Sequence, residues 1–229
     1  AGLRTVIFDL DGTLADTSAD LIGAANARFR ALGLGDLLDP AEDAATAFRG
    51  GRAMLRLGFA RAGRGEDREA LETLVDREYE PFLAAYGTAL NVETRLYPGA
   101  EEAVAALRGA GVRVGVCTNK PVDLAERLLA ELGVADWFGA LVGAGTLAVR
   151  KPDPAPLLAT IARVGGDPAR SLLVGDTATD RETARAAGVA SVLVTFGPLG
   201  RDVADLAPEA LLDAYADLPA LADRLLGPA

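Results

Sequence analysis

The chain has 229 residues, of which 33 are acidic and 23 basic, so its formal net charge is −10 at pH 7. This negative charge, with no basic run, argues against nucleic acid and anionic membrane as partners. The single cysteine excludes an intramolecular disulfide and favours a reducing compartment, and the lack of histidine removes the usual acid or base at neutral pH.

The first predicted element is an apolar strand over residues 5–8, which leads directly into Asp9 and Asp11. From residue 16 to about residue 90 the sequence offers no strand candidate and repeats apolar residues at helical spacing. Pro81 interrupts the last of these helical stripes, and we expect it to break or kink the helix. Residues 16–90 are therefore predicted to form a separate helical bundle, inserted after the first strand.

The rest of the chain returns to an alternation of helices and strands. The predicted elements are a helix at 101–109, strands at 112–117, 140–142, 171–174 and 191–196, an edge strand at 210–213 and a helix at 218–226. Alternation of this kind is typical of βαβ units, which build a parallel sheet covered by helices. We therefore predict an α/β domain formed by residues 1–15 and 91–229.

The cellular location is inferred from two further features. The longest nearly uncharged apolar stretch lies at residues 137–149 and is too short to cross a bilayer. The first residues carry no signal-peptide pattern and enter the first strand directly. These features predict a cytoplasmic protein without a membrane partner. We expect a monomer or a homodimer, a choice that the sequence does not decide.

Polar residues follow four of the predicted strands. They are Asp9, Asp11, Gly12 and Thr13 after the first strand, Thr118, Asn119 and Lys120 after the second, Lys151 after the third, and Asp176 and Asp180 after the fourth. Because the carboxyl ends of parallel strands share one crevice, these side chains are expected to converge. Each residue alone can be interpreted as an ordinary turn residue, helix cap or loop lysine. Four acids clustered with one lysine, however, need counter-ions.

The charges of this cluster indicate its ligands. Four carboxylates near one another resist joint ionisation, and a hard divalent cation relieves the repulsion. All-oxygen ligation by acids suits Mg²⁺, which also binds phosphate oxygens. The Thr118 hydroxyl, the Lys151 ammonium and turn amides such as those of Gly12 and Thr13 can bind an anion. The set fits a phosphoryl group better than a sugar or a hydride carrier.

The chemistry of a chain without histidine must run on other groups. A carboxylate nucleophile that forms an acyl phosphate is expected, and a second carboxylate can protonate the leaving group and then deprotonate water. Asp9 and Asp11 are predicted to divide this work. Lys120 and Lys151 are the only lysines among 23 basic residues, which suggests that both positions require an ammonium rather than a guanidinium.

These residues, in this order, resemble the four motifs of the haloacid dehalogenase superfamily, over nearly the whole chain. The resemblance implies a Rossmann-like core with an inserted helical cap domain, a Mg²⁺ ion and an aspartyl-phosphate intermediate. It implies that Asp9 is the nucleophile and Asp11 the acid and base. Within the superfamily, TNKP at 118–121 and RKPDPAP at 150–156 look most similar to the phosphoglycolate phosphatase group.

The resemblance also implies ligands for the metal and the substrate. The expected metal ligands are Asp9, the backbone carbonyl of Asp11, Asp176 and Asp180. The residues expected to bind the phosphoryl group are Thr118 and Lys151, joined on the phosphate side by Asn119 and Lys120. In the inserted bundle, Arg49 and Arg52 fall where a specificity loop is expected, and either arginine could pair with a substrate carboxylate.

The resulting hypothesis is a Mg²⁺-dependent phosphatase for a small phosphorylated metabolite, with 2-phosphoglycolate as the expected substrate. One alternative is a sugar-phosphate mutase of the same superfamily, which also uses both aspartates. Another is a non-catalytic metabolite-binding protein on the same fold, which would be expected to have lost at least one motif. A dehalogenase is disfavoured because that branch is similar but lacks the second aspartate, here Asp11.

Overall fold

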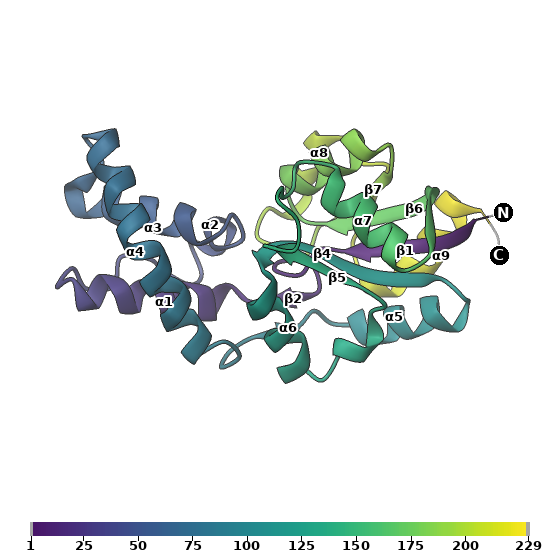
Figure 1. Ribbon diagram of the computed structural model, residues 1–229, viewed down its shortest axis with the longest axis horizontal. Coiled ribbons are helices and arrows are strands. Elements are labelled where there is room, and N and C mark those ends of the chain that lie inside the picture. The colour runs from purple at the N-terminus through teal and green to yellow at the C-terminus, as the bar shows by residue number, and fades with distance from the viewer. Residues whose placement is uncertain (1, 228–229) are drawn as a thin grey trace. The chain divides into compact units, whose positions relative to one another are not determined.

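The computed structural model describes residues 2–227 and divides them into two compact units (Figure 1). An α/β unit contains residues 2–15 and 96–227, and a helical unit contains residues 16–95. The sequence places the second boundary at 90/91, whereas the structure divides the chain at 95/96. No helix among residues 2–227 combines the length and apolar character needed to span a bilayer.

A parallel sheet of six strands forms the centre of the α/β unit. Its strands in chain order are β1 (Leu3–Phe8), β4 (Arg113–Pro121), β5 (Leu141–Ala144), β6 (Gly166–Gly175), β7 (Ala190–Val194) and β8 (Ala210–Leu212). Their spatial order is β5-β4-β1-β6-β7-β8, and every pairing is parallel. This confirms the predicted α/β class, including the edge strand at 210–212. Strands β4 and β5 lie on one side of β1, and strands β6, β7 and β8 lie on the other. The carboxyl end of β1 is therefore a topological switch point, the place where ligands bind in such sheets.

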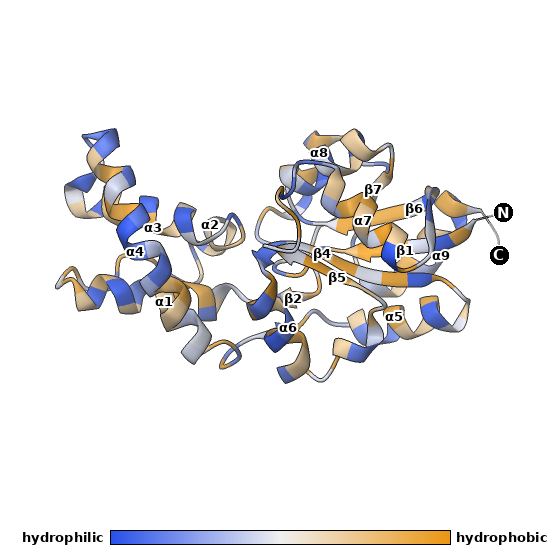
Figure 2. Cartoon of the chain, in the orientation of Figure 1, coloured by the Kyte–Doolittle hydropathy of each residue, from blue (hydrophilic) through white to orange (hydrophobic). Residues whose placement is uncertain are grey.

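Helices cover both faces of this sheet, with α7 and α8 on one face and α5 on the other (Figure 1). The helices of the unit are α5 (Ala100–Gly109), α6 (Val122–Glu131), α7 (Ala155–Arg163), α8 (Ala178–Ala187) and α9 (Leu218–Leu226), with short 3₁₀ turns at Ala135–Trp137, Gly200–Leu206 and Tyr215–Asp217. Hydrophobic residues gather along the strands between the two helical layers (Figure 2). This burial on both faces explains the near-continuous apolar runs from which the strands were predicted.

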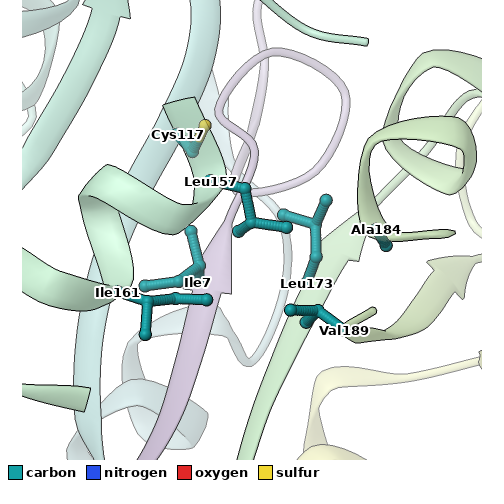
Figure 3. Close-up of a cluster of buried hydrophobic side chains, with 7 residues drawn as sticks. All are labelled: Ile7, Cys117, Leu157, Ile161, Leu173, Ala184 and Val189. Carbon is teal, nitrogen blue, oxygen red and sulfur yellow. The ribbon is translucent and has the colours of Figure 1, made fainter. Parts of the chain in front are cut away.

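A cluster of buried hydrophobic side chains joins the sheet to α7 and α8 (Figure 3). Ile7 of β1 and Leu173 of β6 meet Leu157 and Ile161, which lie one turn apart on α7. Residues spaced by four share one face of a helix, so α7 presents a continuous apolar stripe to the sheet. The cluster fixes the strands just before the point at which their polar ends begin.

The helical unit is built from four helices and a short π-helical turn. They are α1 (Ser18–Ala31), α2 (Ala44–Ala47), α3 (Gly51–Phe59), the turn at Ala60–Arg64 and α4 (Arg68–Thr88). The rings of Phe29 and Phe59 meet edge to face, with centroids 5.4 Å apart. The prediction that the helix breaks at Pro81 is wrong, because α4 continues through this proline to Thr88. Phe82 and the other buried residues of α4 anchor both sides of the proline, so tertiary packing overrides the local penalty.

Two short segments connect the units, and they pair as the strands β2 (Ala15–Asp16) and β3 (Arg95–Leu96). Within the helical unit, the buried carboxylate of Asp20 on α1 accepts hydrogen bonds from the amides of Val92, Glu93 and Thr94 at 2.9–3.1 Å. These bonds hold residues 92–94 against α1 and explain why the boundary falls at 95/96.

Candidate active site

The loop after β1 is a tight turn that fixes Asp9 and Asp11. The Asp9 amide donates to the carbonyl of Val174 in β6 at 2.9 Å, and the Leu10 carbonyl accepts from the amide of Thr13 at 3.2 Å. Gly12 adopts a φ of 78°, a left-handed conformation that favours glycine. Its amide donates to the Ala15 carbonyl at 2.9 Å. The amides of Gly12 and Thr13 thus bond within the loop and do not point at an anion, contrary to what was expected of them from the sequence.

Lys151 lies at the centre of the polar residues and is only 3% exposed. Its ammonium donates to Asp180 Oδ1 at 2.7 Å and to the carbonyl of Cys117 at 2.9 Å, and it lies 3.2 Å from Asp9 Oδ1. Burial opposes the charge of the ammonium, but the carboxylates of Asp180 and Asp9 raise the pKa of Lys151. Lys151 is therefore a fixed positive charge beside Asp9.

Three acids converge around this lysine, as the parallel sheet predicts. Carboxylate oxygens of Asp9, Asp176 and Asp180 all lie within 4.8 Å of one another. The hydroxyl of Thr13 donates to Asp176 Oδ1 at 3.1 Å, and the amide of Asp176 donates to Asp180 Oδ2 at 3.0 Å. A Cβ atom at Gly175 would lie 2.4 Å from the side chain of Asp180, so the close approach of this acid requires glycine there.

The crowding of these acids opposes their ionisation. Burial, together with the negative charge of Asp180, raises the pKa of Asp9 to about 7. Burial and the charge of Asp9 also raise the pKa of Asp176 well above its ordinary value. Burial acts on Asp180 in the same sense, but its bond to Lys151 prevails and lowers the pKa of Asp180. One lysine thus keeps Asp180 ionised and leaves Asp9 and Asp176 short of positive charge.

This donor set fits a hard divalent cation. Asp9 and Asp176 supply carboxylate oxygens, and Mg²⁺ prefers ligation by oxygen alone. A bound cation would also lower the raised pKa values of these two carboxyl groups. Both oxygens of Asp180 already accept hydrogen bonds, from Lys151 and from the Asp176 amide. This bonding suits Asp180 to orienting its neighbours. The carboxylate of Asp11 lies outside the three-acid group.

The three polar residues at the end of β4, Thr118, Asn119 and Lys120, each have a different bonding partner. The buried Thr118 hydroxyl accepts a hydrogen bond from the Lys120 amide at 3.0 Å. The Lys120 ammonium lies 2.9 Å from Asp11 Oδ1. The Asn119 amide group donates to the Lys151 carbonyl at 2.8 Å and accepts from the Lys151 amide at 2.9 Å. Asn119, predicted to bind phosphate, therefore uses its side chain to hold the backbone of Lys151.

A family model for haloacid dehalogenase-like hydrolases matches residues 3–188, which include every one of these strand ends. The chain belongs to the haloacid dehalogenase-like hydrolases. This hydrolase is similar to the phosphoglycolate phosphatase of Agrobacterium fabrum strain C58, with 40% identity over 96% of the chain and 93% of the relative. It is also similar to the phosphoglycolate phosphatase of Caulobacter vibrioides, with 38% identity over 97% of the chain and 92% of the relative.

Solved structures agree with this family assignment. A protein from Lactobacillus delbrueckii subsp. bulgaricus superposes on the hydrolase with a TM-score of 0.84 and 26% identity. The match covers 99% of this chain and 100% of the solved one. The similarity therefore extends through both units of the hydrolase and through the whole sheet that carries the acids.

The two predicted specificity residues of the hydrolase lie in the helical unit. Arg52 on α3 forms an ion pair with Asp76 and stacks over the ring of Tyr79, with its guanidinium carbon 4.5 Å from the ring centroid. Arg49 is exposed in the turn before α3. Its amide donates to the Thr46 carbonyl at 3.0 Å, but its guanidinium forms no hydrogen bond or ion pair among the described residues. Arg52 is therefore occupied within its own unit, whereas Arg49 keeps its charge exposed to solvent.

Tyr215, which precedes α9, supports the site of the hydrolase from a distant part of the sequence. Its buried hydroxyl donates to the Thr13 carbonyl at 2.6 Å, and the Thr13 hydroxyl in turn donates to Asp176. Burial raises the pKa of Tyr215 well above its ordinary value, so the phenol stays a neutral donor. Sequence reasoning missed this residue because an aromatic residue before a helix carries no signal of a polar partner 202 positions away.

Tyr215→Phe is expected to destabilise the hydrolase by about 1–3 kcal/mol, because it leaves the buried Thr13 carbonyl without its donor. Urea unfolding of both proteins at pH 7 measures this difference. Tyr79→Phe, in the helical unit, serves as a control for loss of a phenol hydroxyl. Equal stability of Tyr215→Phe and the parent protein would show that the bond does not support the loop.

Proposed function

We propose that this hydrolase is a Mg²⁺-dependent phosphatase that hydrolyses 2-phosphoglycolate through an aspartyl-phosphate intermediate. The observation that carries the proposal is the pairing of Asp9 with the Lys151 ammonium, inside a group of three acids. Relatives about 40% identical over nearly the full chain are named phosphoglycolate phosphatases, which supports the substrate. In this proposal the helical unit, residues 16–95, serves as the cap domain.

In the proposed reaction Asp9 is the nucleophile. One of its oxygens attacks phosphorus, and the bond from phosphorus to the glycolate oxygen breaks as the acyl phosphate forms. Asp11 gives its proton to that departing oxygen. Asp11 then takes a proton from water, whose oxygen attacks phosphorus and releases inorganic phosphate and free Asp9. The Lys151 ammonium offsets negative charge on Asp9 and on the phosphoryl oxygens throughout.

The metal is assigned to the acids that lack positive charge. Asp9 and Asp176 would hold Mg²⁺ together with the backbone carbonyl of Asp11, and Asp180 would orient them through Lys151 and the Asp176 amide. When bound, Mg²⁺ supplies positive charge that lowers the cost of bringing a phosphate dianion to a carboxylate. Thr118 remains the proposed hydroxyl donor to the phosphoryl group, and Asn119 positions Lys151.

The other candidate functions receive less support. A cysteine nucleophile is disfavoured because burial raises the pKa of Cys117 to about 11 and keeps its thiol neutral. A metabolite-binding protein without activity is disfavoured because all four motifs are present and three of their acids, Asp9, Asp176 and Asp180, converge. A sugar-phosphate mutase would return the phosphoryl group to a sugar, and this difference can be measured in the product.

The test is release of inorganic phosphate from 2-phosphoglycolate, with Mg²⁺ or with excess EDTA, beside a panel of sugar phosphates and p-nitrophenyl phosphate. We expect release that requires Mg²⁺ and a kcat/KM for 2-phosphoglycolate about 10²-fold or more above that for the sugar phosphates. Release that persists in EDTA would contradict the metal assignment. Phosphoryl transfer between sugar positions without release would favour the mutase.

A further inference from the structure

Lys120 and Asp11 form an ion pair at the edge of the site. Lys120 comes from the end of β4 and Asp11 from the loop after β1, 109 positions away in the sequence. The Lys120 ammonium lies 2.9 Å from Asp11 Oδ1, and the side chains of the two residues are 3% and 17% exposed. A buried ammonium loses favourable hydration, so its position at a carboxylate is a specific arrangement rather than a chance contact.

The two lysines of the chain are divided between the two aspartates of the loop. Lys151 lies beside Asp9, and Lys120 lies beside Asp11. The other 21 basic residues are arginines. A compact ammonium can approach one carboxylate oxygen as a point charge, whereas the planar guanidinium favours two-oxygen pairing that would occupy the whole carboxylate. An ammonium therefore pairs with Asp11 without imposing the fixed two-oxygen geometry of an arginine.

A hydrogen bond also holds the backbone of Lys120. Its amide donates to the Thr118 hydroxyl at 3.0 Å, and both residues lie at the end of β4, after Val116 pairs with β1 and before Pro121 pairs with β5. The backbone and the ammonium of Lys120 are thus fixed at the same time. A side chain fixed at both ends can hold the rotamer of its partner.

We propose that Lys120 is a positioning residue that holds the Asp11 carboxyl group for proton transfer and is not a ligand of the phosphoryl group. This inference rests on the proposed phosphatase function. The ammonium lies 2.9 Å from Oδ1 of the carboxyl group that, in the proposed reaction, gives a proton to the leaving oxygen and then takes one from water. This differs from the expectation drawn from the sequence, which placed Lys120 on the phosphate side.

Lys120→Met tests the proposal, since methionine keeps a similar length without charge. The measured quantity is kcat/KM, which reports the first phosphoryl transfer, for alkyl phosphates and for p-nitrophenyl phosphate. Alkoxide leaving groups need a proton from Asp11, whereas p-nitrophenolate leaves without one. We expect a loss of about 10²-fold for 2-phosphoglycolate and glycerol 2-phosphate, and a loss below about threefold for p-nitrophenyl phosphate.

A double-mutant cycle isolates the route of the effect. In an Asp11→Asn background, Lys120→Met is expected to change kcat/KM for the alkyl phosphates by less than about threefold, because the group that it positions is absent. The same loss in both backgrounds would overturn the proposal. A uniform loss over all leaving groups, with weaker inhibition by inorganic phosphate, would assign Lys120 to the phosphoryl group instead.

Two further variants separate positioning from folding and from substrate selection. If Lys120→Met does not fold, Lys120→Arg keeps the charge, and an intermediate loss confined to alkyl phosphates supports the proposal. A loss confined to 2-phosphoglycolate, with glycerol 2-phosphate unaffected, would mean that Lys120 reads the substrate carboxylate, and would overturn it. If the parent protein releases phosphate from no ester, both the phosphatase assignment and this role of Lys120 are refuted. If the parent is active and the variant loses activity equally on all esters, only this role of Lys120 is refuted.

Discussion

Asp9→Asn is expected to lower kcat for 2-phosphoglycolate by about 10⁴-fold or more, because an amide cannot form the acyl phosphate. The substitution preserves the size of the side chain, and the neighbouring Lys151 keeps its stronger bond to Asp180 at 2.7 Å. The fold should therefore survive. Rates of phosphate release at saturating substrate and Mg²⁺ measure the effect.

The stability of Asp9→Asn separates loss of chemistry from loss of structure. Burial and the charge of Asp180 raise the pKa of Asp9 to about 7, so ionised Asp9 is unfavourable in the metal-free protein. Replacing it with a neutral amide is expected to raise the melting temperature at pH 8 in EDTA. Asp136→Asn, at an exposed carboxylate, is the matched control and should change neither quantity. Near-normal turnover in Asp9→Asn would show that the nucleophile is another residue.

The metal-free protein is expected to lose stability as the pH rises from about 4 to about 7, by an amount on the order of 3 kcal/mol. Asp9 and Asp176 have pKa values raised above the ordinary 3.8. Such groups keep their protons in the folded state while the unfolded chain releases them. Their contribution to the free energy of unfolding is therefore complete below pH 3.8 and is lost as the pH rises through the folded-state pKa. Asp180, with a lowered pKa, contributes stability that is lost only below pH 3.8, outside this window.

Mg²⁺ should reverse this loss, because it binds the ionised carboxylates and only in the folded state. Free energies of unfolding in urea, at pH 5 and pH 8 with EDTA or with Mg²⁺, test the prediction without any assay of activity. Stabilisation by Mg²⁺ should be larger at pH 8 than at pH 5, and Asp176→Asn should abolish most of it. Equal metal-free stability at both pH values, with no response to Mg²⁺, would contradict the assignment of these acids.

Much of the α/β unit follows from sequence patterns. Strands buried on both faces give short apolar runs, and polar residues at their ends are conspicuous against that background. The parallel order then brings Asp9, Lys151 and Asp176 together, although they are far apart in the chain. Local patterns were less informative where tertiary contacts decide, as at Pro81, which α4 includes because buried residues on both sides of it hold the helix.

The direction of individual polar groups was the part that the sequence could not predict. A side-chain amide such as that of Asn119 can bond a substrate or a neighbouring backbone equally well, and only the path of the chain at Lys151 decides between them. The same holds for the amides of Gly12 and Thr13, which the tight turn directs into the loop. Tyr215 carries no pattern that relates it to Thr13, because their contact arises only when the last elements complete the sheet.

The most direct test of the account is to locate the covalent intermediate. Acid quench during turnover of 2-phosphoglycolate with Mg²⁺, followed by borohydride reduction, converts an aspartyl phosphate to homoserine, which peptide mass spectrometry can place in the sequence. The account predicts homoserine at position 9 and at no other aspartate. Homoserine at position 11 or 176 would contradict this prediction. So would an active enzyme that gives no homoserine and accumulates the phosphoryl group on another type of residue.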